Sequence, residues 1–153
     1  FEPTQLKGGA PMTQLSNFYF YDTNGGVFAQ GDYVNWDRSF PAGNAGGGHS
    51  PGGEQPYNAA DFNVNTKWLD YRATGGGLFI DLGDNIPTIG YGWDTANDTP
   101  SRDPYAWRVW ASQTNNAEDW YLVSQVNSFY ATDGRRTQAG SWYWDSSLFG
   151  TQP

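Results

Sequence analysis

Short runs of alternating apolar and polar residues recur along the chain, and clusters of Gly, Pro, Asn, Asp, Ser and Thr separate them. Runs of roughly four to eight residues with a period of two are typical of β-strands, and the clusters between them are typical of turns. No stretch keeps the period of about 3.6 residues that an amphipathic helix needs. The pattern therefore predicts an all-β chain.

About eight short strands are expected at this spacing, which predicts an antiparallel sandwich or barrel. The expected strands are Leu15–Tyr21, Tyr33–Trp36, Trp68–Tyr71, Gly77–Gly83, Ile89–Trp93, Trp107–Ala111, Trp120–Val123 and Ser141–Asp145. We expect residues 1–13 to form an extended N-terminal arm. Residues 41–56 hold many Gly and Pro and are expected to form a long loop.

Several of these strands carry aromatic residues on both faces. Alternation places Trp107 and Val109 on one face of their strand, and Arg108 and Trp110 on the other. The runs at 18–21 and 142–144 likewise carry aromatic residues on both faces. Only one face of a strand can face a single core, so the second aromatic faces predict contact with a ligand or with another subunit.

The composition fits one domain whose core is built from large rings. The chain has 153 residues, which predicts a single domain spanning residues 1–153. Aromatic residues make up 18% of the chain, with eight Trp, ten Tyr and nine Phe, so rings supply much of the core volume. The sequence has no cysteine, which excludes disulfides and thiolate metal sites.

A formal net charge of −8 argues against nucleic acid and anionic membranes as partners. No apolar run approaches the ~20 residues of a spanning helix, so direct membrane insertion is not expected. The chain starts at Phe1 without an initiator Met, which favours a processed chain or an excised segment. We expect an extracellular location or an organelle lumen.

The densest group of oxygen-bearing side chains follows a Gly-rich turn. Asp61, Asn63 and Thr66 recur at intervals of two and three residues. This density suits a hard cation such as Ca²⁺, and it equally suits a loop tied by Asx-type hydrogen bonds without a metal. The residues alone leave both alternatives open.

Two carboxylates close in sequence raise the question of catalysis. Asp98 and Asp103 flank Arg102, whereas glycoside hydrolysis needs two carboxyls roughly 5 to 10 Å apart, one with a raised pKa. An arginine between them lowers the pKa of both, which favours a salt-bridged loop over a general acid. His49 is the only histidine, so neither a triad nor a zinc site is predicted. The chain is expected not to be an enzyme.

Three sequence blocks follow one another in order and cover about half of the chain. They are the Asn58, Ala60, Asp61, Thr66 and Trp68 pattern, the strand Leu78–Gly83, and the segment Thr95–Trp107, which reads Thr-Ala-Asn-Asp-Thr-Pro-Ser-Arg-Asp-Pro-Tyr-Ala-Trp. Together they resemble the discoidin family, also known as coagulation-factor C-type domains, and the third block is similar to the signature of one subgroup. The resemblance implies an antiparallel jelly-roll β-sandwich of the galactose-binding-like kind.

The resemblance also has departures. In most relatives a strand similar to 15–21 closes the domain, whereas here it comes first, which implies a circularly shifted strand order. Asn17 stands where relatives with a structural calcium often have a glutamate, and an amide is the weaker ligand. By resemblance, the Ca²⁺ ligands would be Asp61, Thr66 and backbone carbonyls near Ala60 and Asn63.

The resemblance implies a non-catalytic carbohydrate-binding or adhesive module. Sugar recognition needs a flat ring together with a few amide, carboxylate or guanidinium groups. Loop aromatics that could supply the ring are Tyr33, Trp36, Tyr57, Tyr71 and Tyr105. We expect the ligand-binding residues to be Tyr57, Asn97, Asp98 and Arg102.

A second hypothesis explains the same surplus of aromatic residues. The aromatic outer faces would be buried against other subunits, which would make the chain a structural or extrinsic accessory subunit of a larger assembly. The expected partners are therefore glycans in the first case and protein subunits in the second.

Overall fold

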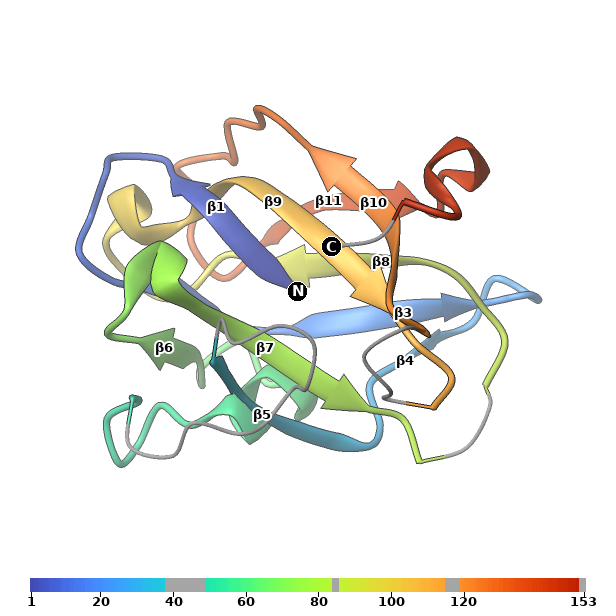
Figure 1. Cartoon of the computed structure of the whole chain (residues 1–153). Coiled ribbons are helices and arrows are strands. Elements are labelled where there is room, and N and C mark those ends of the chain that lie inside the picture. Colours follow the sequence, from blue (N-terminus) through green and yellow to red (C-terminus); the bar gives the residue numbers. More distant parts are fainter. Residues whose placement is uncertain (38–48, 84–85, 115–118, 152–153) are drawn as a thin grey trace.

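The computed structural model describes residues 1–37, 49–83, 86–114 and 119–151 (Figure 1). Its helical elements within these ranges are short 3₁₀ turns, at Pro56–Ala60 (η1), Ala73–Gly75 (η2), Pro100–Arg102 (η3) and Ser146–Leu148 (η5). The strands are β1 (Glu2–Leu6), β2 (Thr13–Leu15), β3 (Phe18–Asp22), β4 (Val27–Phe28), β5 (Asp32–Asp37), β6 (Trp68–Asp70), β7 (Gly76–Asp81), β8 (Thr88–Asp94), β9 (Pro104–Ala111), β10 (Tyr121–Val126) and β11 (Gln138–Tyr143).

The strands form antiparallel sheets, which confirms the all-β prediction. One sheet has four strands in the order β11-β8-β3-β4, and another has three in the order β1-β9-β10. Two further pairs join β2 to β6 and β5 to β7. Figure 1 shows β1 beginning between β9, with which it pairs, and β7, whose Leu78 N–H donates to the Phe1 carbonyl at 3.0 Å. Among the described residues, no helix has the length and apolar character needed to span a bilayer.

Most of the predicted strands lie where the pattern places them. The strands predicted at 33–36, 68–71, 77–83, 89–93, 107–111 and 120–123 coincide with β5 to β10, with ends shifted by a few residues. The run at 15–21 divides, because β2 ends at Leu15 and β3 begins at Phe18. The last strand, β11, begins and ends earlier than predicted. Residues 49–55 contain no strand, and residues 41–48 of the predicted loop lie outside the described ranges.

Within the segment predicted as an extended N-terminal arm, residues 1–13, Glu2–Leu6 forms β1 and pairs with β9. The register of this pair shifts between Pro3 and Gln5. Proline cannot donate a ladder hydrogen bond and is tolerated in strands at such irregularities. The segment contains this proline and lacks a regular alternation of apolar and polar residues, so the sequence pattern does not predict a strand there. Pairing with β9 stabilises β1 as a strand.

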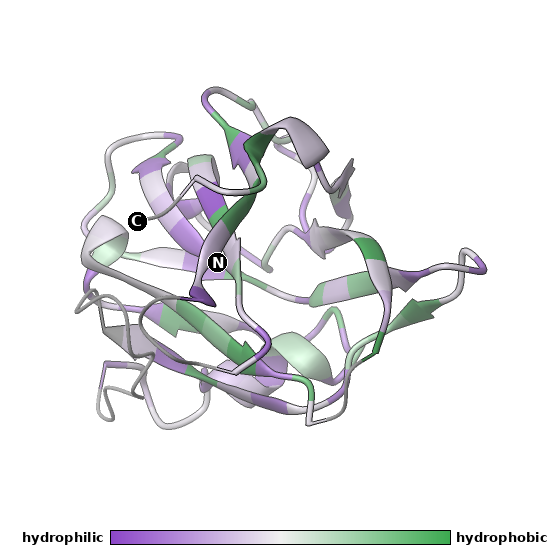
Figure 2. Ribbon diagram, turned by 45° about the vertical axis from the view of Figure 1, so that its right-hand side comes forward, coloured by the Kyte–Doolittle hydropathy of each residue, from purple (hydrophilic) through white to green (hydrophobic). Residues whose placement is uncertain are grey.

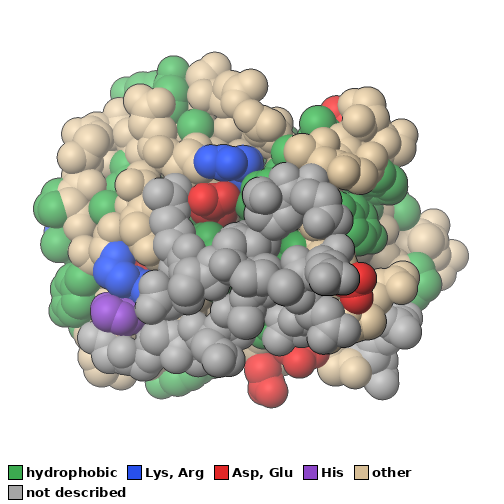
Figure 3. Space-filling view, in the orientation of Figure 1, with side chains coloured by type: hydrophobic (Ala, Val, Ile, Leu, Met, Phe, Trp, Pro, Cys, Tyr) green, Lys and Arg blue, Asp and Glu red, His purple; other side chains and the backbone are tan. Residues whose placement is uncertain are grey.

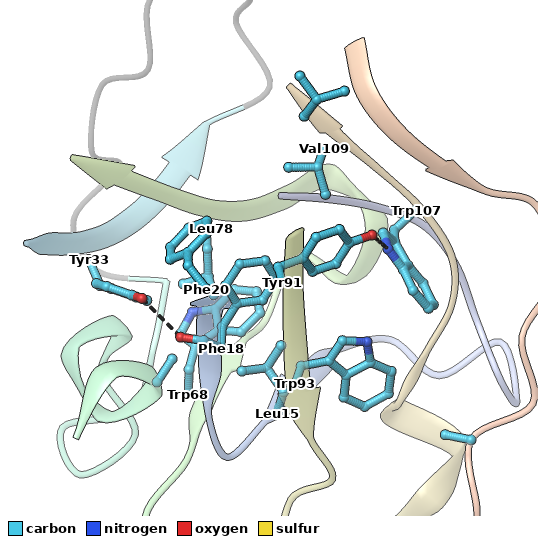
Figure 4. Packing of buried hydrophobic residues seen from close by; sticks show 13 residues of the cluster. Leu15, Phe18, Phe20, Tyr33, Trp68, Leu78, Tyr91, Trp93, Trp107 and Val109 are labelled. Atoms are coloured by element: carbon cyan, nitrogen blue, oxygen red, sulfur yellow. Dashed lines mark hydrogen bonds between the residues drawn. The ribbon is translucent and has the colours of Figure 1, made fainter. Parts of the chain in front are cut away.

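Aromatic rings fill the core, as the composition predicts. Trp68, Trp93, Trp107 and Tyr91 are fully buried. Figure 4 shows Tyr91 beside Phe18, whose ring centroid lies 5.3 Å away, and the rings of Trp93 and Trp107 lie 5.8 Å apart. Trp107 Nε1 donates to the Tyr91 hydroxyl at 2.7 Å, and burial raises the pKa of Tyr91 to about 12. Figure 2 shows hydrophobic and hydrophilic residues alternating along several strands, so each sheet has an inner and an outer face.

The alternation predicted for β9 is confirmed. Trp107 and Val109 belong to the core cluster. On the opposite face, Trp110 Nε1 donates to Glu2 Oε2 at 2.9 Å, and Arg108 Nε lies 3.5 Å from the same oxygen. Figure 3 shows a basic group directly beside an acidic group on this side of the molecule. The second face of β9 is therefore covered in part by polar contacts from β1.

Candidate functional site

Buried Lys67 joins two loops at one end of the molecule. Its Nζ donates to Asp98 Oδ1 at 2.8 Å and to Gln14 Oε1 at 3.0 Å, and it lies 3.5 Å from Glu54 Oε1. Gln14 is placed by β2, where it pairs with Leu69 of β6. We call Gln14, Glu54, Lys67, Asp98 and Arg102 the Lys67 cluster. A buried ammonium with several oxygen partners makes this end of the molecule rigid.

Asp98 is the charged centre of this cluster. Its backbone carbonyl accepts from Gln14 Nε2 at 2.6 Å, and its carboxylate lies 4.0 Å from Arg102 NH1. Partial burial acts to raise the pKa of Asp98, but the hydrogen bond and charge of Lys67, assisted by Gln14 and Arg102, lower the pKa below its ordinary value. Asp98 is therefore an ionised hydrogen-bond acceptor at neutral pH.

Asp103 belongs to a different ion pair. Its carboxylate is fully buried and accepts two hydrogen bonds from the Arg135 guanidinium, at 2.8 and 2.6 Å. Burial raises the pKa of Asp103, and Arg135 offsets only part of that effect. The prediction that Arg102 lowers the pKa of both carboxylates is thus wrong for Asp103, because this side chain is buried and its partner is Arg135. No local pattern links residues so far apart in sequence.

The predicted ligand residues lie on two segments that meet at Lys67. Tyr57 is carried by η1, which begins at Pro56, and its side chain is 62% exposed. The neighbouring Asn58 fixes this turn, because its Nδ2 donates to the carbonyls of Gly53 at 2.8 Å and Lys67 at 3.0 Å. Asn97, Asp98 and Arg102 lie on the second segment, where Asn97 and Asp98 are exposed.

Two of the five loop aromatics proposed as sugar platforms are part of the core. Tyr33 and Trp36 are buried in β5, and the Tyr33 hydroxyl donates to the Phe18 carbonyl at 2.9 Å. Their short strand did not alternate clearly enough to show which face is buried. Tyr71 is 52% exposed, and Tyr105 is partly buried. Tyr57 and Tyr71 are the exposed rings of this group.

The loop at residues 61–66 is tied together by its own side chains. Asp61 Oδ1 accepts from the Asn63 N–H at 2.8 Å, and Asp61 Oδ2 accepts from Thr66 Oγ1 at 2.7 Å. Asn63 Oδ1 accepts from the Asn65 N–H at 3.1 Å. These are the Asx-type hydrogen bonds of the metal-free alternative. They hold Phe62 in a left-handed conformation, with φ of 53°.

A calcium ion fits this donor set poorly. The side-chain oxygens of Asp61 and Asn63 already accept hydrogen bonds from the loop, and a metal would have to displace these donors. Asn17 Nδ2 donates to Asp94, while Asn17 Oδ1 is buried without a hydrogen-bond partner in the described part of the chain. The described residues contain no group of three or more His, Cys, Asp or Glu side chains suited to a metal. The calcium site stays a prediction.

A cavity of about 830 Å³ opens between the C-terminal halves of β7 and β9. Aromatic and aliphatic side chains dominate its lining, including Phe79, Trp110, Trp120 and Trp144, and Glu2 and Asp81 add two carboxylates. Its lining includes none of the four predicted ligand residues. The cavity is therefore separate from the Lys67 cluster.

In comparisons with known proteins, no family model, no curated protein and no solved structure matches the chain. The resemblance to discoidin domains therefore rests on the three sequence blocks alone.

Proposed function

We propose that this chain is a non-catalytic carbohydrate-binding or adhesive module that acts outside the cell or in an organelle lumen. We assign its fold to the discoidin-like jelly-roll β-sandwich with a circularly shifted strand order. One observation carries the functional proposal: the exposed ring of Tyr57 stands on a turn fixed to Lys67, and Lys67 also fixes the exposed carboxylate of Asp98.

This arrangement supplies both parts of a sugar site. A pyranose has an apolar face, which packs on an aromatic ring, and hydroxyls at its edge, which need donors and acceptors. Tyr57 supplies the ring, Asp98 the acceptor, and Asn97 and Arg102 the donors. Because Lys67 holds Asp98 in place before any ligand arrives, less conformational entropy is lost on binding.

The state of the two carboxylates supports a role without catalysis. A glycosidase needs one carboxylic acid that is protonated at its working pH and can reach the glycosidic oxygen. The pKa of Asp98 is lowered, mainly by Lys67 acting against partial burial, so this group is a poor acid. The pKa of Asp103 is raised by burial, but its side chain is fully buried against Arg135 and cannot contact a substrate.

A glycan array followed by calorimetric titration of the best soluble glycan tests the proposal. We expect Tyr57→Ala and Arg102→Ala to weaken binding about tenfold or more, as for a buried contact residue. Tyr71→Ala is the matched control, since Tyr71 is an exposed ring outside the Lys67 cluster. Absence of glycan binding by the unmodified protein, or loss of stability alone in the variants, would contradict the proposal.

The accessory-subunit alternative is favoured by one observation, the exposure of Val27, Phe62 and Tyr143. Gentle extraction from the native source separates the two functions. A binding module elutes alone, or is released from its complex by competing sugar. Co-migration with a large complex that survives competing sugar would instead identify a structural subunit.

A further inference from the structure

The outer face of the four-stranded sheet carries a row of aromatic rings. In β3, Phe18 and Phe20 face the core, so Tyr19 and Tyr21 face outward. The register aligns Tyr21 and Tyr143 with Gly90, one on each side of β8. Ring centroids along the row are 6.1 Å apart for Phe62 and Tyr19, 5.9 Å for Tyr19 and Tyr21, and 6.0 Å for Tyr21 and Tyr143. We call Phe62, Tyr19, Tyr21 and Tyr143 the tyrosine strip.

Glycines on the central strand make room for these rings. Gly90 and Gly92 occupy the outward positions of β8 between β3 and β11. A Cβ at Gly92 would lie 2.5 Å from Tyr19 Cε2, so no side chain fits beneath that ring. A Cβ at Gly90 would collide with the backbone of Trp142 in β11, so the glycine lets β11 lie close to β8. The rings of Tyr21 and Tyr143 face each other across β8 at an interplanar angle of 28°.

Hydrogen bonds fix the strip along one edge. The Tyr21 hydroxyl pairs with Ser141 Oγ at 2.6 Å, and Gln138 Nε2 donates to Ser141 Oγ at 3.0 Å and to the Tyr21 hydroxyl at 3.3 Å. The Tyr19 hydroxyl donates to Asp94 Oδ1 at 3.3 Å. The rings are therefore held in place beside hydroxyl and amide groups that can bind further hydroxyls.

Phe62 extends the strip at a cost in backbone strain. Its φ of 53° is unfavourable for a bulky residue, and its ring is half exposed although it stacks on Tyr19. The hydrogen bonds of Asp61 with Asn63 and Thr66 maintain this conformation. Strained residues persist where the surroundings fix them, and they concentrate at binding sites.

We propose that the tyrosine strip is a second carbohydrate-binding surface, which takes successive units of an extended, uncharged polysaccharide. The exposed rings of Phe62 and Tyr143 and the partly buried ring of Tyr21 would contact the apolar faces of the sugars. Ser141 and Gln138 would bind hydroxyls. Tyr19 is buried beneath the strip and supports it. The ligand class rests on the proposed function, whereas the site is separate from Tyr57 and the Lys67 cluster.

Size and charge argue for this occupant. A stable protein interface uses about 20 to 30 residues on each side, whereas the strip offers one row of rings with Val27 beside it, which suits a ligand one sugar wide. Asp22 and Asp94 lie at opposite ends of the strands beneath the strip, and their carboxylates accept hydrogen bonds from the protein itself. With a net charge of −8, the chain disfavours an anionic polysaccharide.

Retention on insoluble cellulose and chitin tests the proposal. We expect the unmodified protein to be retained on at least one of them, and the double variant Phe62→Asn and Tyr143→Ser to lower the bound fraction about tenfold. Asn tolerates the left-handed backbone at position 62. Tyr71→Ser is the control, because Tyr71 is an exposed ring outside the strip and outside the Lys67 cluster, and it is expected to be retained like the unmodified protein.

If the double variant does not fold, NMR spectroscopy of the unmodified protein tests the proposal instead. Soluble oligosaccharides of the retained polymer, added to the unmodified protein, should shift the ring resonances of Tyr21 and Tyr143 and leave that of Tyr71 unchanged. No retention on either polymer, equal retention of the double variant, or conversion of a dimer to a monomer by that variant would overturn the proposal. If Tyr57→Ala alone abolishes retention, the Lys67 cluster binds the sugar and the strip does not.

Discussion

Gly92 of β8 lies directly beneath the ring of Tyr19, its antiparallel partner in β3, and a Cβ at Gly92 would lie 2.5 Å from Tyr19 Cε2. Because of this close contact, the observed position of the Tyr19 ring requires a residue without a side chain at position 92. If a methyl group were added, the Tyr19 ring would move away from Asp94 and from Phe62, its neighbours on the outer face.

Gly92→Ala is therefore expected to destabilise the protein by about 1–3 kcal/mol, as overpacking usually does. Urea unfolding of the variant measures this change. Gly52→Ala is the matched control, because a Cβ at Gly52 meets nothing within 4 Å. Equal stability of the two variants would show that the Tyr19 ring can move without cost.

Replacing Arg135, the partner of buried Asp103, should lower the free energy of unfolding more than replacing one member of an exposed ion pair. Arg135→Met leaves a fully buried carboxylate without its two guanidinium hydrogen bonds, and we expect a loss of about 3–5 kcal/mol. Arg135→Lys keeps the charge but not the paired geometry, so it should rescue stability only in part. Thermal unfolding compares the two variants, and full rescue by lysine would contradict the importance of the bidentate geometry.

The free energy of unfolding should depend on pH because the pKa of Asp98 is lowered in the folded protein. The folded-state pKa of Asp98 is lowered below 3.8, chiefly by Lys67 against the opposing effect of partial burial. A lowered folded pKa stabilises the protein above the unfolded pKa, and this contribution is lost as the pH falls from about 5 towards 2. Asp98→Asn should therefore be less stable at neutral pH and should lose less stability on acidification. Melting curves over this range test the sign, and parallel curves for both proteins would contradict it.

The 61–66 loop should depend on its hydroxyl hydrogen bond. Thr66→Val keeps the shape of the side chain but removes the hydroxyl contacts with the Asp61 carboxylate and the Asn63 carbonyl, so we expect a loss of about 0.5–1.5 kcal/mol. Thr74→Val, in the separate 3₁₀ turn η2, is the control. If the two variants lose the same stability, the hydroxyl contacts of Thr66 contribute nothing of their own.

Calcium should leave this loop unchanged, because Asp61 and Asn63 already accept hydrogen bonds from within it. We expect the same melting temperature in excess calcium chloride and in EDTA. A melting temperature several degrees higher with calcium would show instead that the ion predicted by resemblance binds and displaces these hydrogen bonds.

Local patterns in the sequence determined the positions of most strands and, in β9, which residues face outward. Period-two alternation depends only on the geometry of one strand, so β7, β8 and β9 could be predicted from their residues alone. The hydrogen bonds within 61–66 are equally local, and the metal-free alternative anticipated them.

Tertiary structure alone decided which distant groups meet. The partners of Lys67 are Gln14 and Asp98, and the partner of Asp103 is Arg135, because pairs of strands and loops far apart in sequence bring them together. The same holds for β1, whose proline-containing segment becomes a strand on the edge of β9. Such contacts depend on the packing of the whole chain, and no spacing of neighbouring residues encodes them.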